Sequence, residues 1–269
     1  ENASPVVGDR VFAVSANDGT NAGAAATVTV TVAATNDTPT VSIVDGTPSF
    51  TESQGSHAAN NATVINNAIT LADLDTTVLK DATVEITNVQ TGDVLALDTS
   101  THTKFDATLS GGVLTIAEKS GQTASTAELQ AALRAVTFAN TTDTPDTTAR
   151  TIEFKVSDGN STSVAATESV AVTATNDIPS FTFTDGTPSF TESQGTHASN
   201  NETVINSSFA AGDLDGSIAS ATVVLTNAKA GDALLFTDTA KIEGTITDDT
   251  SAGTKTLVLT PVSGQTPSP

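Results

Sequence analysis

The chain has 269 residues, of which 31 are acidic and 10 basic, so its formal net charge is −21. It contains no Cys, Met, Trp or Tyr, which excludes disulfides, cysteine-ligated metals and c-type haem and leaves Phe as the only aromatic residue. The charge argues against nucleic acid or an anionic membrane as a partner, and no apolar run reaches the roughly 20 residues of a membrane helix.

The first 36 residues end in an alternating segment, Val28 to Val32, which predicts a β-strand. It runs into Ala34-Thr35-Asn36-Asp37-Thr38-Pro39, where the proline stops regular strand pairing. The same arrangement returns in Ala174-Thr175-Asn176-Asp177-Ile178-Pro179, after a second alternating segment, Val170 to Thr173. We interpret both joints as hinges between β domains.

An internal repeat organises the chain. The nine residues Thr47 to Gly55 recur from Thr187 to Gly195, a period of 140 residues. Asp18-Gly19 stands as far before Asp37 as Asp158-Gly159 stands before Asp177. We therefore expect residues 1–36 to be the last strands of a preceding repeat, 37–177 a complete repeat, and 178–269 the N-terminal part of a following one.

The middle repeat reads mainly as β structure. Its Val-, Ile- and Thr-rich segments predict strands at 41–44, 62–71, 82–89, 113–117, 151–156 and 164–172. Short strands separated by turns favour an antiparallel sandwich. Ser125 to Glu128 form a capping box before Leu129 and Leu133, which share a face, so we expect one short helix that covers an end of the sandwich.

Acidic residues gather at the ends of the predicted strands and at the joints. Each Asp-x-Asp pair follows a strand, and in an extended backbone both carboxylates point to one side. Calcium takes six to eight oxygen ligands, mainly carboxylates, amide oxygens and carbonyls. Turn preference alone accounts for Asp45, Asp93 and Asp143. It accounts less well for Asp73, Asp75 and Asp158, and for the second pair Asp213 and Asp215, if these side chains cluster, because carboxylates without a cation repel one another.

The order of these motifs resembles the cadherin-like tandem repeats of large bacterial surface and secreted proteins. The resemblance rests on the Asn-Asp-x-Pro joints, the Asp-x-Asp pairs, the Phe-x-Glu segments at Glu52 and Glu192, and the segment Thr151 to Gly159. It implies an all-β class of tandem antiparallel Greek-key β-sandwiches, cadherin- or immunoglobulin-like, with calcium bound at each joint.

Carried over by position, the resemblance implies two sets of Ca²⁺ ligands. The first joint would use Asn36, Asp37, Asp73, Asp75 and Asp158; the second would use Asn176, Asp177, Glu52, Asp213 and Asp215; Glu192 and Asp18 are the matching candidates for further joints. Thr38 and Ile178 stand where animal cadherins have a second Asn, and the mid-domain Leu-Asp-Arg-Glu motif has no clear counterpart. We therefore expect fewer ions per joint or weaker binding.

We predict no enzymatic activity. His57 and His197 lie in matching loops, and His102 stands apart, without the spacing of a zinc site or a nucleophile-elbow motif. Paired carboxylates also serve glycoside hydrolysis, but Trp and Tyr, which form sugar platforms, are missing.

Three functions remain open at this point. The first is a calcium-stiffened spacer of a long extracellular bacterial adhesin or matrix protein, secreted or surface-attached, whose partners are the neighbouring repeats of its own chain. The second is calcium-dependent binding of cell-surface polysaccharide or of like repeats through the loop from Gln54 to Asn61. The third is a head-to-tail filament in which incomplete terminal repeats exchange strands; a longer array of repeats that has simply been cut accounts for the same ends.

Overall fold

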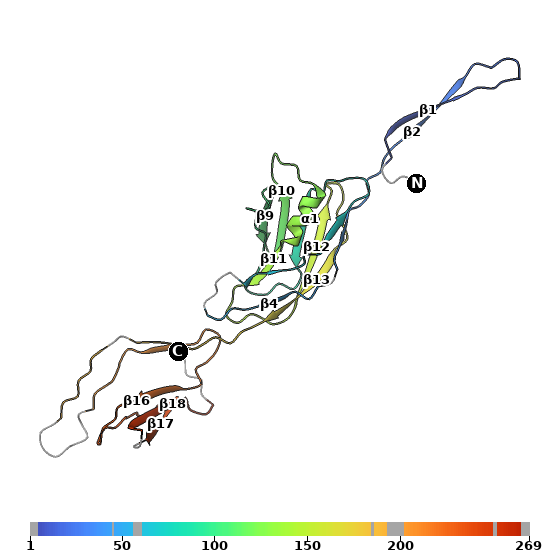
Figure 1. Ribbon diagram of the computed structural model, residues 1–269. Helices are drawn as coiled ribbons and strands as arrows, with labels where there is room; N and C mark the ends of the chain where they lie inside the picture. Colours follow the sequence, from blue (N-terminus) through green and yellow to red (C-terminus); the bar gives the residue numbers. More distant parts are fainter. Residues whose placement is uncertain are drawn as a thin grey trace. The chain divides into compact units, whose positions relative to one another are not determined.

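The computed structural model describes residues 5–44, 46–55, 61–183, 186–192, 202–249 and 252–264. The chain divides into two compact units, which we describe separately. Unit 1 comprises Glu1–Glu52 and Ala58–Ala174, and unit 2 comprises Ser53–His57 and Thr175–Pro269. Both are built from β-strands, and the described residues contain one short α-helix (Figure 1).

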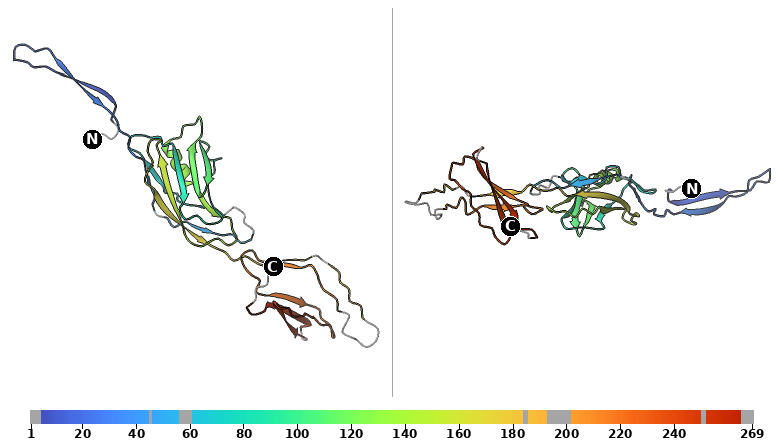
Figure 2. Two further views of the ribbon diagram at one scale, coloured as in Figure 1. Left: turned by 180° about the vertical axis from the view of Figure 1, so that it is seen from behind. Right: turned by 90° about the horizontal axis from the view of Figure 1, so that it is seen from below.

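Unit 1 contains a hairpin and several further sheets. The hairpin pairs β1 (Gly8–Val14) with β2 (Ala26–Val32), seen as a two-stranded ribbon in Figure 2. The largest sheet has the order β4-β13-β12-β7-β10-β9, with bounds Ser49–Thr51, Ala166–Thr173, Arg150–Ser157, Asp81–Ile86, Val113–Glu118 and Phe105–Ser110. A three-stranded sheet has the order β5-β11-β8, with bounds Thr63–Val64, Thr137–Asn140 and Asp93–Ala96, and β3 (Thr40–Ser42) pairs with β6 (Thr70–Ala72).

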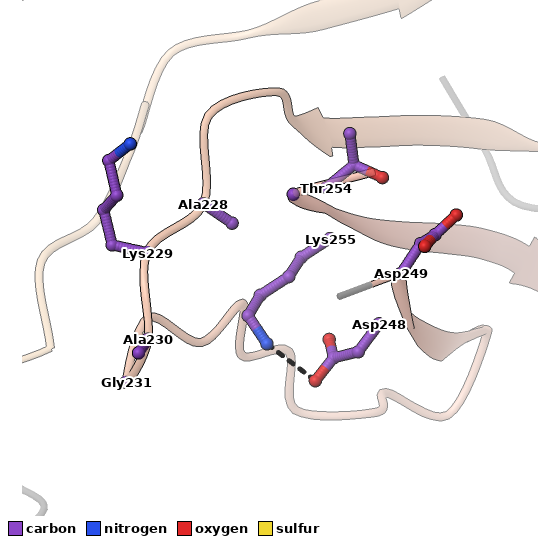
Figure 3. A pocket seen from close by; sticks show the side chains of 9 residues that line it. Ala228, Lys229, Ala230, Gly231, Asp248, Asp249, Thr254 and Lys255 are labelled. Atoms are coloured by element: carbon purple, nitrogen blue, oxygen red, sulfur yellow. Dashed lines mark hydrogen bonds and ion pairs between the residues drawn. The ribbon is translucent and has the colours of Figure 1, made fainter. Parts of the chain in front are cut away.

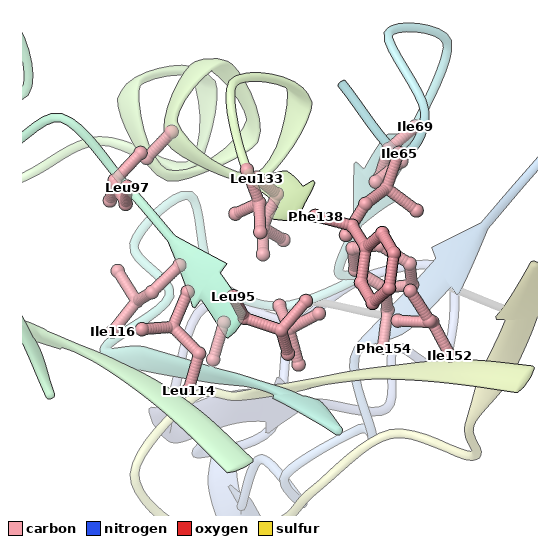
Figure 4. Packing of buried hydrophobic residues seen from close by; sticks show 14 of the residues in the cluster. Ile65, Ile69, Leu95, Leu97, Leu114, Ile116, Leu133, Phe138, Ile152 and Phe154 are labelled. Atoms are coloured by element: carbon pink, nitrogen blue, oxygen red, sulfur yellow. The ribbon is translucent and has the colours of Figure 1, made fainter. Parts of the chain in front are cut away.

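Alternating side chains of these strands build the core. Along β7 and β12 every second residue is buried, which places Ile86 opposite Ile152 and Val84 opposite Phe154. Figure 4 shows Ile152 and Phe154 among the packed side chains of this core. The arrangement agrees with the predicted all-β sandwich. One pairing departs from the expected antiparallel pattern, because β4 lies parallel to β13.

The predicted helix is confirmed as α1 (Thr126–Arg134). The Ser125 side chain accepts the amide of Glu128, and the Glu128 side chain accepts the amide of Ser125, which completes the capping box. Leu129, Ala132 and Leu133 are buried in the core. The helix is therefore a packing element of unit 1.

The strand predicted over residues 62–71 is broken in two, as β5 and β6. Between them the Asn66 side chain accepts the amide of Ala68 and donates to the carbonyl of Val44. An Asn side chain that bonds nearby backbone competes with strand pairing. The sequence pattern did not reveal this turn, because Ile65 and Ile69 on either side of it are both buried core residues and so give the appearance of one continuous apolar segment.

Unit 2 repeats part of this pattern. Its strands are β14 (Ser180–Thr182), β15 (Ala210–Gly212), β16 (Ala221–Leu225), β17 (Ile242–Asp249) and β18 (Thr254–Pro261). The β14–β15 pair has Ser180 opposite Gly212, as β3–β6 has Thr40 opposite Ala72. The sheet order β16-β18-β17 matches the order β7-β10-β9 in unit 1. The division of the chain into residues 1–36, 37–177 and 178–269 stays a prediction.

None of the helices in the described residues has the length and apolar character needed to cross a membrane.

Candidate metal centres

At the first joint of unit 1 the backbone of Asp37 meets the carboxylates of Asp73 and Asp75. The backbone amide of Asp37 donates to Oδ2 of Asp75 at 3.2 Å, and the amides of Asp75 and Thr76 donate to Oδ1 of Asp73 at 3.0 and 3.2 Å. Oδ2 of Asp73 and Oδ1 of Asp75 are buried and have no hydrogen-bond donor. Two carboxylate oxygens are thus withdrawn from water without a partner, which is costly unless a cation approaches.

The electrostatics of this group agree with its geometry. The pKa of Asp75 is raised above its usual range, mainly by the neighbouring Asp73 carboxyl, and the negative charges of Asp73 and Asp37 add to this effect. The three carboxylates therefore repel one another, and a bound cation would relieve that repulsion.

Asn36 and Asp158 form a second part of the first joint. Nδ2 of Asn36 donates to Oδ2 of Asp158 at 2.8 Å and to Oγ of Ser161 at 2.7 Å, and its Oδ1 accepts from Asn160 at 3.0 Å. The amides of Ser161 and Asn160 donate to Oδ1 of Asp158, and these bonds lower its pKa to about 2. Asp158 is charged and well supplied with donors, so in this structure it holds the joint through Asn36.

Unit 2 contains the matching group of three aspartates. One carboxylate oxygen of each residue is buried without a hydrogen-bond donor: Oδ2 of Asp177, Oδ1 of Asp213 and Oδ1 of Asp215. The Asp177 residue as a whole is 1% exposed. The pKa of Asp213 is raised by desolvation first and then by Asp215, with a smaller contribution from the charge of Asp177. The two groups thus share their sequence spacing, and in both the Asp-x-Asp pair has unpartnered oxygens.

Asp177 is also fixed by backbone contacts within unit 2. Its Oδ1 accepts the amide of Gly55, and the Gln54 side chain donates to the carbonyl of Asn176 at 3.2 Å. Gly55 has φ +83°, a conformation that favours glycine, so the amide can turn toward the carboxylate. The Asn176 side chain donates to the carbonyl of Asp177 at 2.7 Å and so supports the turn.

The remaining predicted ligands lie elsewhere. Glu52 is 3% exposed, and one of its oxygens lies within 4.8 Å of a carboxylate oxygen of Asp143 in the same unit. Its predicted role at the second joint involves both units and stays a prediction. Glu192 is exposed, and Asp18 caps its own turn by accepting the amides of Thr20 and Asn21.

Two of the residues assigned to simple turns have other surroundings. Asp143 contacts the Glu52 region, and no spacing signal in its Thr-rich loop indicates this. Asp93 does accept the amide of Gln90 in a turn, but it also forms a fully buried ion pair with Arg150, Nε to Oδ2 at 2.7 Å. One signal in the sequence could have indicated this pair: Arg150 alternates in phase with Ile152 and Phe154, whose side chains face the core, so a buried acidic partner is expected. Asp45, His57 and His197 lie outside the described residues.

One shallow pocket of about 280 Å³ in unit 2 is separate from these aspartates (Figure 3). It lies between the turn at Ala228 to Gly231 and the facing ends of β17 and β18, and Lys255 pairs with Asp248 across it at 2.6 Å. Because the ammonium group of Lys255 is already paired with Asp248, we assign no ligand to this pocket.

Comparisons of the chain with protein-family models, with curated proteins and with solved structures found no match.

Proposed function

We propose that this chain is a calcium-stiffened structural segment of a long extracellular bacterial adhesin or matrix protein, built from cadherin-like Greek-key repeats. The observation that supports it best is the recurrence of one arrangement: Asp37, Asp73 and Asp75 in unit 1 have the same spacing as Asp177, Asp213 and Asp215 in unit 2. In both groups buried carboxylate oxygens lack donors.

The donor set fits a hard divalent cation. In both aspartate groups the unpartnered atoms are carboxylate oxygens, and calcium accepts such ligands together with carbonyls and water in a flexible geometry. Bound calcium would supply two positive charges and so offset most of the negative charge of the three carboxylates. Zinc is a poorer fit, because its structural sites use Cys and His, and the chain has no Cys and only three His.

Stiffening follows from where the first group lies. Asp37 belongs to the short segment between β2 and β3, and its amide is already bonded to Asp75. Asn36 ties the same segment to the Asp158 turn. An ion shared by Asp37, Asp73 and Asp75 would add a further link to this segment and limit its rotation.

Thermal unfolding with and without calcium tests the proposal. We expect calcium to raise the melting temperature, because a ligand that binds only the folded state stabilises it by about 2.7 kcal/mol at about 100 times its dissociation constant. Calorimetry or circular dichroism should be used, since the chain lacks Trp and Tyr. An unchanged transition after chelation would contradict calcium binding.

Matched variants assign the effect to each group. Asp73→Asn with Asp75→Asn should remove the calcium response of unit 1, and Asp213→Asn with Asp215→Asn that of unit 2. Asp106→Asn, on a side chain that is 63% exposed, is the control and should leave both responses intact. If the paired variants respond to calcium like the parent chain, the aspartates are not the ligands.

The polysaccharide hypothesis stays a prediction. The loops on which it rests fall largely at residues 56–60 and 193–201, outside the described residues. A glycan array in the presence of calcium tests it directly, and an absence of retention would count against it.

A further inference from the structure

The side chain of Asn36 joins two segments of unit 1 that lie far apart in the sequence. Asn36 stands in the segment between β2 and β3, and Asp158 and Ser161 belong to the turn between β12 and β13. Nδ2 of Asn36 donates to Oδ2 of Asp158 at 2.8 Å and to Oγ of Ser161 at 2.7 Å. Because residues 33–39 belong to no strand, side-chain contacts such as these hold the segment in place of strand pairing.

The Nδ2 atom of Asn36 is surrounded by more acceptors than it can serve. Besides the oxygens of Asp158 and Ser161, the carbonyl oxygen of Asp37 lies 2.9 Å from the same nitrogen. A side-chain amide has two hydrogens on its nitrogen, so it cannot give all of these oxygens a well-directed bond at one time. Oxygens that converge on one point are also what a hard cation needs. The amide therefore occupies a place at which Asp158 would otherwise be open to an ion.

The orientation of the Asn36 amide follows from its neighbours. The ionised carboxylate of Asp158 and the carbonyl of Asp37 only accept hydrogen bonds, so the NH₂ group has to face them. On the other side, Oδ1 of Asn36 accepts Nδ2 of Asn160 at 3.0 Å. Both ends of the amide are thus engaged, and the oxygen that a cation would use is turned toward Asn160 and away from Asp158.

The turn that receives the amide is fixed by its own backbone. The amides of Asn160 and Ser161 donate to Oδ1 of Asp158 at 2.6 and 2.7 Å. Gly159 has φ +95°, a conformation that favours glycine. The turn that begins at Asp18 makes the same two backbone bonds, so this geometry follows from the local sequence. Asp158 is therefore held ready with its second oxygen, Oδ2, turned toward the β2–β3 segment.

From these contacts we propose that Asn36 is a latch, which holds the β2–β3 segment closed on the Asp158 turn in the ion-free protein and competes with calcium for Asp158. The latch follows from the hydrogen bonds alone, whereas the competition rests on the calcium function proposed above. Oδ2 of Asp158 becomes accessible to a cation only after the Asn36 amide has left it. Asn160 is then a positioning residue, because its bond to Oδ1 of Asn36 keeps the amide turned toward Asp158.

Asn36→Ala tests the latch in chelator. The readout is the protection of the Asp37 amide against hydrogen exchange, because this amide is bonded to Asp75 only while the segment is closed. We expect the protection factor, measured by NMR on the whole chain, to fall roughly fivefold or more when the bonds to the charged carboxylate are lost. Thr38→Ala, on an exposed neighbour in the same segment, is the control and should leave it unchanged.

Asn36→Asp separates a latch from a simple packing contact, because it keeps the size of the side chain and removes its donors. In chelator the new carboxylate faces Asp158, so the like charges repel and the segment should open at least as far as in Asn36→Ala. In calcium the new carboxylate is a further oxygen ligand, so the segment should close again. Parent-level protection of Asp37 in chelator, in both Asn36 variants, would overturn the latch.

Asn160→Ala tests the competition while Asn36 and Asp158 both stay in place. Without the Asn160 side chain, the Asn36 amide is free to turn its oxygen toward Asp158. We expect calcium to bind roughly threefold more tightly or better than in the parent, because one hydrogen bond that opposes binding is gone. The titration is followed by the NMR signals of the Asn36 side chain. Thr162→Ala, exposed on the same turn, is the control. Equal or weaker calcium binding by Asn160→Ala would overturn the competition.

These measurements distinguish failure of the latch from failure of the calcium function. If calcium shifts no signal of Asn36 or Asp158 while both Asn36 variants lose protection in chelator, the latch stands and the competition fails together with the calcium function. If calcium binds the parent chain but the Asn36 variants keep full protection in chelator, the latch is wrong and the calcium function stands.

Discussion

The two units carry the same repeat and bury it to different extents. Ile65 is 1% exposed in unit 1, while Ile205, 140 residues later, is 60% exposed in unit 2. Phe50 is 3% exposed and Phe190 is 67% exposed, although both stand in the identical sequence Thr-Pro-Ser-Phe-Thr-Glu. In unit 1, Phe50 meets Phe138 of β11 edge to face, with ring centroids 5.7 Å apart. Burial is therefore conferred by later strands of the repeat.

The largest expected effect comes from breaking the buried ion pair that is present only in unit 1 among the described residues. Arg150→Met leaves the Asp93 carboxylate buried without its cation and should cost about 3–5 kcal/mol of stability. Urea unfolding followed by circular dichroism measures this. Asp93→Leu added to Arg150→Met should recover most of the loss. Lys155→Met, which breaks a partly exposed pair on the same strand, should cost about 0–1 kcal/mol; equal losses for Arg150 and Lys155 would refute the argument.

Matched truncations test the difference in burial directly. Ile65→Ala should cost about 2–5 kcal/mol, because it removes a buried side chain and leaves a cavity. Ile205→Ala should change the stability of unit 2 by about 0.5 kcal/mol or less, since that side chain is exposed in this structure. Amide hydrogen exchange resolves the two units. A large effect at Ile205 would mean that unit 2 buries this side chain in solution.

A smaller effect concerns the helix, which among the described residues occurs only in unit 1. Ser125→Ala removes the side chain that accepts the Glu128 amide and should cost about 1 kcal/mol. Ser110→Ala, at the exposed end of β9, is the control and should be nearly silent. Both are measured by the urea midpoint, and identical midpoints would show that the cap contributes nothing.

The smallest predicted effect is a pH dependence in unit 1. The Lys104 ammonium, followed by the Ser125 amide, lowers the pKa of Glu128 from its ordinary 4.5 to about 2. Because the unfolded chain binds this proton more readily, the stability that Glu128 contributes is complete above about pH 4.5 and is lost as the pH falls toward 2. Glu128→Gln should therefore lose less stability than the parent between about pH 6 and about 3 in urea unfolding, and identical pH curves would contradict the argument.

Much of the local structure could be predicted from the chain alone. The alternating segments became β7, β10, β12 and β13, and the Ser125 capping box became the start of α1. The Asp-x-Asp spacing indicated that Asp73 and Asp75 share an environment, although by way of an extended backbone. The structure instead has a bend there, in which the Asp75 amide donates to the Asp73 carboxylate. These features depend on neighbours within a few residues.

Other features depended on contacts between distant segments. Asp93 looked like a turn residue, and only the packing of β12 brings Arg150 onto it. The approach of Asp143 to Glu52 has no signal in either sequence neighbourhood. The break at Asn66 was hidden because the apolar residues around it face the core from both sides of a turn.

The sequence by itself determined the β character, the helix cap and the Asp-x-Asp pairs, because each is a matter of local spacing, and comparison of the chain with itself gave the 140-residue period. Only the tertiary structure decided which strands are buried and which carboxylates are left without donors. The physical reason is that burial belongs to a pair of surfaces. Val84 and Val223 occupy matching strands, and Val84 is buried because α1 and other strands of unit 1 pack with it in one core.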